Sequence, residues 1–153
     1  MAGANVDTSY KDLTYIIKSR IHEDRLCALI ILVYKFEKAK TKQERQRVVD
    51  FYLKYHLYGN NWDLVDVVAP KILGPWLIHG DKSLLYEYAH SSNLWERRIA
   101  IITTFHFIRQ VEFEDTIKIS EILLNDKHDL IHKAVGWMLR EIGKKAQKSL
   151  LIS

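Results

Sequence analysis

Four side chains in this sequence could act together on a substrate: Trp62, Asp66, Arg98 and Trp137. Trp62 and Asp66 are four residues apart, a spacing that puts both on one face of a helix. Aromatic faces attract cations, a carboxylate stabilises developing positive charge, and an arginine binds phosphate. This set suits a polyanion that carries a local cation, such as DNA with an alkylated purine. Loss of that base leaves an oxocarbenium-like sugar, as in glycoside cleavage.

The same residues also have purely structural interpretations. A lone tryptophan such as Trp62 is more often a core residue that covers a helix interface. Asp66 could form a structural salt bridge with Arg98, and Trp137 could fill the space beside Gly136. The choice depends on whether the four side chains converge on one open surface.

Basic residues are concentrated in two regions, which favours a polyanionic partner. The formal net charge is +4 and the pI is about 9.1. Taken alone, each of these two basic regions is more typical of a solvated helix face. Lys133, Trp137 and Arg140 share one face of the C-terminal helix at i, i+4 and i+7. We predict DNA contacts for Arg97, Lys133, Arg140 and Lys144.

Helical periodicity runs through the whole sequence, and no stretch is a convincing strand. We expect residues 1–9 to be a flexible N-terminal arm and residues 10–153 to be a single domain. Pro70 and the pair Gly74–Pro75 are expected to interrupt the fourth helix, with a kink beside Asp66. The expected helices are Tyr10–Arg20, Glu23–Lys38, a third from a Thr41 cap to Tyr55, a fourth that begins at Trp62, Lys82–His90, Leu94–Arg109, Glu112–Leu124 and Asp129–Ser149.

Landmark residues recur at intervals of 35 to 37 positions, at Arg25, Trp62, Arg98 and Lys133. A period in this range with two helices per unit is typical of stacked helical repeats. We therefore predict an all-α, right-handed α-solenoid of about four HEAT-like helix pairs, whose second helices line the inner face. The alternative is an irregular helical bundle.

Several classes of protein and site are disfavoured. Cys27 is the one cysteine and lies in an apolar run, so an internal disulfide is impossible and a reducing compartment fits. The polar N-terminus and the lack of an apolar run of roughly 20 residues argue against secretion and membrane insertion. We expect a cytoplasmic protein, nucleoid-associated if the source is prokaryotic. His106, His128 and His132 lack metal-ligand spacing, so no metal or other cofactor is predicted.

Three strings resemble the AlkD-like family of DNA alkylation repair proteins: NNWDLVDVVAPKILG, NLWERRIAIITTFHFIR and DLIHKAVGWMLREIGK. The resemblance extends from about Tyr10 to Lys145, and the chain looks shortened at both ends relative to the family. It implies a solenoid of HEAT-like repeats that excises N3- and N7-alkylated purines from double-stranded DNA. Unlike most glycosylases, members of this family do not flip the damaged base into a pocket.

The resemblance also implies a role for each of the four residues. Asp66 matches the catalytic aspartate, which would stabilise the cationic sugar and position water. Trp62 and Trp137 match the two active-site tryptophans, which would contact the deoxyribose and backbone of the lesion. Arg98 matches the active-site arginine, which would hold phosphate.

Three functions are therefore considered. The first is a DNA glycosylase for alkylated purines, with no obligate protein partner. The second is a HEAT-like module that binds damaged or branched DNA without chemistry. The third is a protein-interaction scaffold, which has no need of the matched set of four residues.

Overall fold

Eight α-helices and one 3-10 turn form the computed structural model, which describes residues 7–152. The predicted all-α class is confirmed, because the described residues contain no strand. Most of the predicted N-terminal arm lies outside the described residues; its last residue, Ser9, accepts the Asp12 N–H at 3.1 Å and caps the first helix. The elements are α1 (Tyr10–Ile17), α2 (His22–Lys38), α3 (Lys42–Tyr55), η1 (His56–Tyr58), α4 (Trp62–Leu77), α5 (Ser83–Ala89), α6 (Leu94–Arg109), α7 (Glu114–Ile122) and α8 (Asp129–Ile152).

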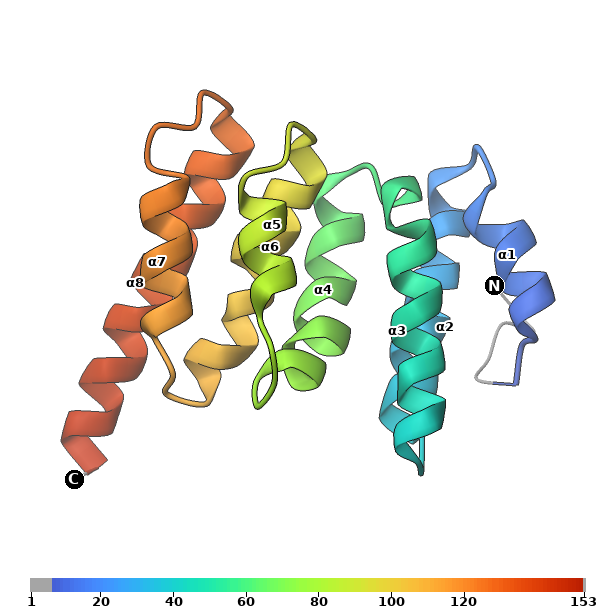
Figure 1. Cartoon of the computed structure of the whole chain (residues 1–153), viewed down its shortest axis with the longest axis horizontal. Coiled ribbons are helices and arrows are strands. Elements are labelled where there is room, and N and C mark those ends of the chain that lie inside the picture. Colours follow the sequence, from blue (N-terminus) through green and yellow to red (C-terminus); the bar gives the residue numbers. More distant parts are fainter. Residues whose placement is uncertain (1–6, 153) are drawn as a thin grey trace.

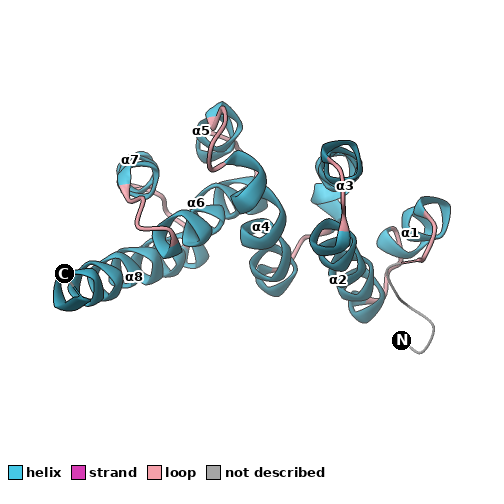
Figure 2. Ribbon diagram, turned by 90° about the horizontal axis from the view of Figure 1, so that it is seen from below, coloured by secondary structure: helices cyan, strands magenta, loops and turns pink. Residues whose placement is uncertain are grey.

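The helices alternate between two layers (Figures 1 and 2). Helices α1, α3, α5 and α7 form one layer, and α2, α4, α6 and α8 form the other. In the second layer α2 packs on α4, α4 on α6 and α6 on α8, so each helix meets the next in turn. This arrangement confirms the predicted α-solenoid over the irregular bundle. The handedness of the stack and the HEAT-like character of its pairs stay predictions.

A side-chain motif at the start of α2 organises the turn that precedes it. The Ser19 hydroxyl donates to Asp24 at 2.7 Å and accepts the Ile21 N–H at 3.1 Å. The Arg25 guanidinium donates to the Ser19 carbonyl oxygen at 2.9 Å. Together these bonds satisfy two backbone groups of the turn, the Ile21 N–H and the Ser19 carbonyl.

The same motif recurs 72 residues later, at the start of α6, through Ser91, Asn93, Glu96 and Arg97. An interval of 72 residues spans two helix pairs, so the hydrogen bonds themselves mark the repeat. They also correct the predicted register. Arg25 corresponds to Arg97 and not to Arg98, because it is Arg97 that bonds the turn before its own helix.

Helix α4 runs unbroken from Trp62 to Leu77, so the interruptions predicted at Pro70 and at Gly74–Pro75 are wrong. A proline inside a helix costs about 3 kcal/mol. Burying an aliphatic side chain contributes about 2 kcal/mol, and tertiary packing overrides local propensity where enough are buried. Four such side chains of α4 have no exposed surface: Leu64, Val68, Ile72 and Leu73. The kink beside Asp66 stays a prediction.

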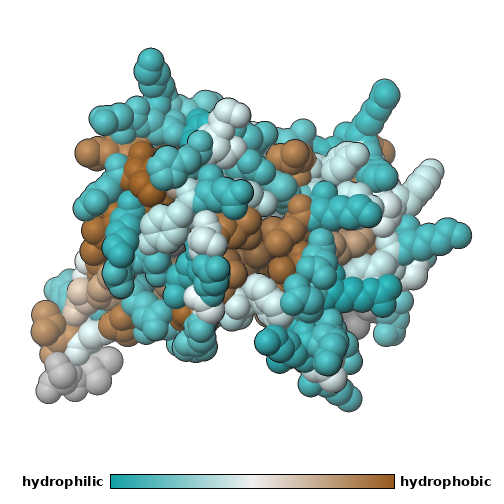
Figure 3. Space-filling model, in the orientation of Figure 1, coloured by the Kyte–Doolittle hydropathy of each residue, from teal (hydrophilic) through white to brown (hydrophobic). Residues whose placement is uncertain are grey.

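The surface shows mainly hydrophilic side chains, with apolar ones gathered between them (Figure 3). Among the described helices, none combines the length and the apolar composition needed to cross a bilayer. Cys27 is buried as a small apolar residue, as predicted.

Two partly buried carboxylates near the starts of α6 and α8 are expected to make the fold sensitive to acid. Burial alone raises the pKa of Glu96, but hydrogen bonds from Ser91 and His56 outweigh it and hold that pKa below its ordinary value. Burial likewise raises the pKa of Asp126, and the His128 N–H and the Arg97 guanidinium outweigh it. Because both folded pKa values are depressed, this stabilisation is complete above the ordinary pKa values and is lost as the pH falls through the folded ones.

Urea unfolding at a series of pH values below about 5 checks this expectation. The free energy of unfolding should fall with pH in the wild type and fall less steeply in Glu96→Gln and Asp126→Asn. Equal slopes in all three proteins would contradict it.

Candidate functional site

A salt bridge between α4 and α6 lies at the centre of the second layer. The Arg98 Nε donates to Asp66 Oδ1 at 3.0 Å, and its Nη2 donates to Asp66 Oδ2 at 2.8 Å. The Arg98 Nη1 donates to the Leu130 carbonyl oxygen at 2.6 Å, near the start of α8. Arg98 is only 6% exposed, so its guanidinium ties together three neighbouring helices. The structural salt bridge considered from the sequence is therefore present.

Asp66 nevertheless keeps contact with solvent. Its side chain is 15% exposed, about twice the 7% of Arg98. Each carboxylate oxygen has lone pairs beyond the one that Arg98 occupies. Asp66 is thus fixed from its buried side and open on the other.

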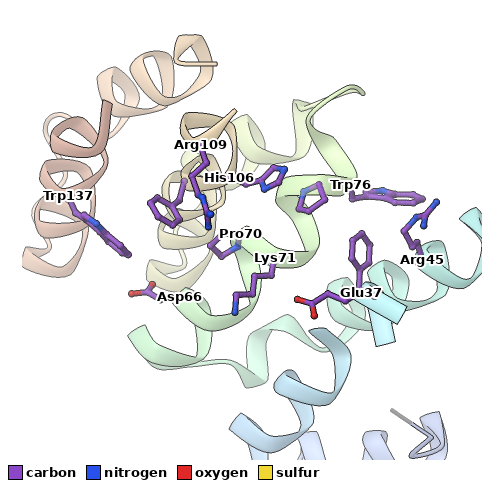
Figure 4. A pocket seen from close by; sticks show the side chains of 12 residues that line it. Glu37, Arg45, Asp66, Pro70, Lys71, Trp76, His106, Arg109 and Trp137 are labelled. Atoms are coloured by element: carbon purple, nitrogen blue, oxygen red, sulfur yellow. The ribbon is translucent and has the colours of Figure 1, made fainter. Parts of the chain in front are cut away.

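The open side of Asp66 lines a groove of about 730 Å³ on the second layer (Figure 4). Five helices contribute to it: α2, α3, α4, α6 and α8. Trp137 and Asp66 lie at one end of the groove, and Trp76 and Arg45 at the other. The groove is lined by Phe36, Glu37, Arg45, Asp66, Pro70, Lys71, Pro75, Trp76, Phe105, His106, Arg109 and Trp137.

The two predicted tryptophans have different surroundings. Trp137 is half-buried, its Nε1–H donates to Glu141 at 3.3 Å, and its ring packs against Phe105 with centroids 5.6 Å apart. Trp62 is 52% exposed and does not line the groove. The core interpretation of Trp62 is therefore wrong, although its helix places it one turn before Asp66.

The four predicted DNA-binding residues lie outside the groove lining. Arg97 is partly buried, and its guanidinium donates to Asp126 at 2.6 Å and to the carbonyl oxygens of Ser91 and Ser92. The others are exposed on α8: Lys133 pairs with Asp129 at 3.0 Å, Lys144 pairs with Glu141 at 3.6 Å, and Arg140 points to solvent.

The sequence model of the DNA alkylation repair enzyme family matches residues 3–151. The chain belongs to this family. Neither a curated protein nor a solved structure matches the chain. Membership supports an enzymatic role in the repair of alkylated DNA, with DNA as the partner.

In this family member, several groove residues are not among those predicted from the sequence. Phe105 and Arg109 follow Arg98 at i+7 and i+11, so a stripe along one face of α6 could have identified them. Lys71 directly follows Pro70, and its place on the groove depends on the continuity of α4 past that proline. Burial, and then the charge of Arg109, hold the pKa of His106 below its ordinary value. Among the described residues, no group of His, Cys, Asp and Glu could hold a metal ion.

Arg98→Lys is expected to destabilise the repair protein by about 1 to 3 kcal/mol, because a lysine cannot span both Asp66 oxygens and the Leu130 carbonyl. Urea unfolding measures the loss. Arg140→Lys makes the same exchange at an exposed position and should change stability by less than about 0.5 kcal/mol. If the two exchanges changed the free energy of unfolding equally, the hydrogen bonds of the Arg98 guanidinium would have no structural role.

Proposed function

We propose that the chain is a DNA glycosylase that hydrolyses the N-glycosidic bond of N3- and N7-alkylated purines. The observation that carries the proposal is the placement of Asp66. Its carboxylate is held on both oxygens by a buried arginine and opens on a groove beside Trp137. A fixed carboxylate at an open surface suits a reaction that develops positive charge at a sugar.

In the proposed reaction the bond between C1′ and the purine nitrogen breaks first. The bonding electrons leave with the base and neutralise its positive ring, and the sugar becomes oxocarbenium-like. Asp66 stabilises that cation and orients a water molecule, whose oxygen bonds to C1′ while its proton passes to the carboxylate or to solvent. Arg98 holds Asp66 in position, since its donors already bind Asp66 and Leu130. This positioning role replaces the phosphate contact expected from the resemblance.

The aromatic residues and the shape of the site support recognition of the lesion within the duplex. Trp137 presents its ring at the Asp66 end of the groove (Figure 4) and can contact the deoxyribose. Trp62 is exposed one turn before Asp66 and can contact the backbone. A groove shared by five helices suits a strand better than a single extruded base, so we extend the proposal to excision without base flipping.

Base release from duplex DNA tests the proposal. The protein is incubated with a duplex that contains 7-methylguanine, and free base is measured by chromatography. A matched undamaged duplex is the control. Release from the damaged duplex alone is expected; no release by folded protein that binds this duplex would contradict the proposal.

The structure also gives the non-catalytic DNA-binding module a specific basis. The pairing of Asp66 with Arg98 would stabilise the helix stack even if neither group did chemistry. A module of this kind would bind DNA with an affinity that falls as salt rises and would release no base. The release assay therefore separates the two functions.

A further inference from the structure

The groove carries positive charge along its length beyond Asp66. Lys71 and Arg109 are exposed on α4 and α6, and Arg45 is half-buried on α3. Within the described part of the chain, none of these three cations forms a salt bridge with an acidic side chain; Arg109 stacks over the Phe105 ring at 5.9 Å. Unpaired cations in a concave site attract phosphate strongly.

The cations on α8 are placed differently. Lys133 and Lys144 each lie close to a carboxylate on their own helix, Asp129 and Glu141 respectively. These exposed pairs lower the positive charge that the two lysines offer to a phosphate only in part, and Arg140 on the same helix forms no salt bridge with a described residue. What distinguishes the groove from the exposed face of α8 is its concave shape, which brings cations from several helices toward one bound strand.

The groove also has a direction relative to Asp66. From the Trp137 end it passes Lys71 and reaches Arg45 and Trp76, so it extends from Asp66 toward α2 and α3 (Figure 4). Trp76 offers an aromatic surface at the far end, where a sugar or base of the bound strand can pack. Glu37 lies in the same region and opposes the positive charge.

We infer that the groove binds the DNA strand on one flank of the lesion, with Lys71 and Arg109 on phosphates near Asp66 and Arg45 on a phosphate farther along. This inference rests on the proposed function, because Asp66 marks the position of the lesion. The DNA on the two sides of the lesion then contributes unequally to binding. The flank that lies in the groove is required, and the opposite flank contributes less.

Charge variants test the groove as a phosphate site. Lys71→Ala and Arg109→Ala should each weaken binding of undamaged duplex about three- to tenfold and lower the slope of log affinity against log salt by about 1. Glu37→Gln should tighten binding about twofold or more, since it removes an opposing charge. Lys11→Ala, which removes an exposed lysine on α1, should do neither. Equal weakening by Lys71→Ala and Lys11→Ala would overturn the assignment.

Substrates with the lesion near one end test the asymmetry. Duplexes of equal length carry 7-methylguanine at the centre, a few base pairs from the 5′ end, or a few base pairs from the 3′ end of the damaged strand. One end-proximal substrate should be excised at the rate of the central one, and the other about tenfold more slowly. Equal rates for the two end-proximal substrates would overturn the inference.

A binding measurement separates this inference from the proposed function. Phosphate ethylation interference is recorded on a duplex with a tetrahydrofuran abasic analogue, which requires no base release. Interference on one side of the analogue, lost at specific phosphates in Lys71→Ala, supports the flank assignment even if 7-methylguanine is never released. Interference spread equally over both sides, or absent, would overturn it.

Discussion

Asp66→Asn should lower the rate of release of 7-methylguanine by at least about 100-fold, the usual effect of removing a preorganised electrostatic group from an active site. Affinity for duplex DNA should stay within about threefold, because a carboxylate attracts no phosphate. The asparagine side chain has the same shape as the aspartate, but its NH2 group replaces one of the two oxygens that accept hydrogen bonds from Arg98. One donor of Arg98 then faces another donor. Stability should therefore fall by about 1 to 3 kcal/mol.

Asp63→Asn is the matched control for this variant. Asp63 lies on the same helix three residues earlier, pairs with His22 at 2.7 Å and does not line the groove. It removes the same charge from α4 and should leave base release within about twofold, since the effect of a charge falls with distance. If Asp66→Asn weakened binding and release equally, Asp66 would have a structural role and no part in the chemistry.

The predictable part of this fold is the part fixed by local sequence. Thr41 accepts the Glu44 N–H at 3.1 Å, so the cap predicted for the third helix is confirmed, and Asn93 caps α6 in the same way by accepting the Trp95 N–H at 2.8 Å. Helix capping depends on residues a few positions apart, which a single sequence displays. The continuity of α4 through Pro70 depends on packing against other helices. A single sequence does not display that packing.

The candidate site also has features that local sequence predicts and features that depend on how the helices pack. The face shared by Trp62 and Asp66 follows from helical spacing, but the exposure of Trp62 and the burial of Arg98 depend on how helices stack. Arg97 and Arg98 are adjacent and chemically identical, yet one binds Asp126 and the other Asp66. Neighbouring positions on a helix point about 100° apart, so the register of the repeat decides which arginine reaches the site.

Gly74→Ala should destabilise the protein by about 2 to 3 kcal/mol through overpacking where α4 crosses α6. A Cβ built on Gly74 would overlap the Cβ of His106 and lie 2.8 Å from its Cγ. The Cβ of His106 is fixed to its backbone and cannot rotate away, so the two helices must separate. Asp66 and Arg98 lie on these same helices, and their separation should lower base release as well as stability.

Gly143→Ala is the control, because a Cβ there meets no atom within 4 Å. An alanine in an open helical position stabilises by roughly 0.5 to 1 kcal/mol, so the two glycine variants should shift the urea midpoint in opposite directions. Adding His106→Gly to Gly74→Ala moves the Cβ from one helix to the other and should recover most of the loss. If the double variant were no more stable than Gly74→Ala, the overlap with His106 would not be its cause. Recovery of base release together with stability would tie the spacing of α4 and α6 to the chemistry at Asp66.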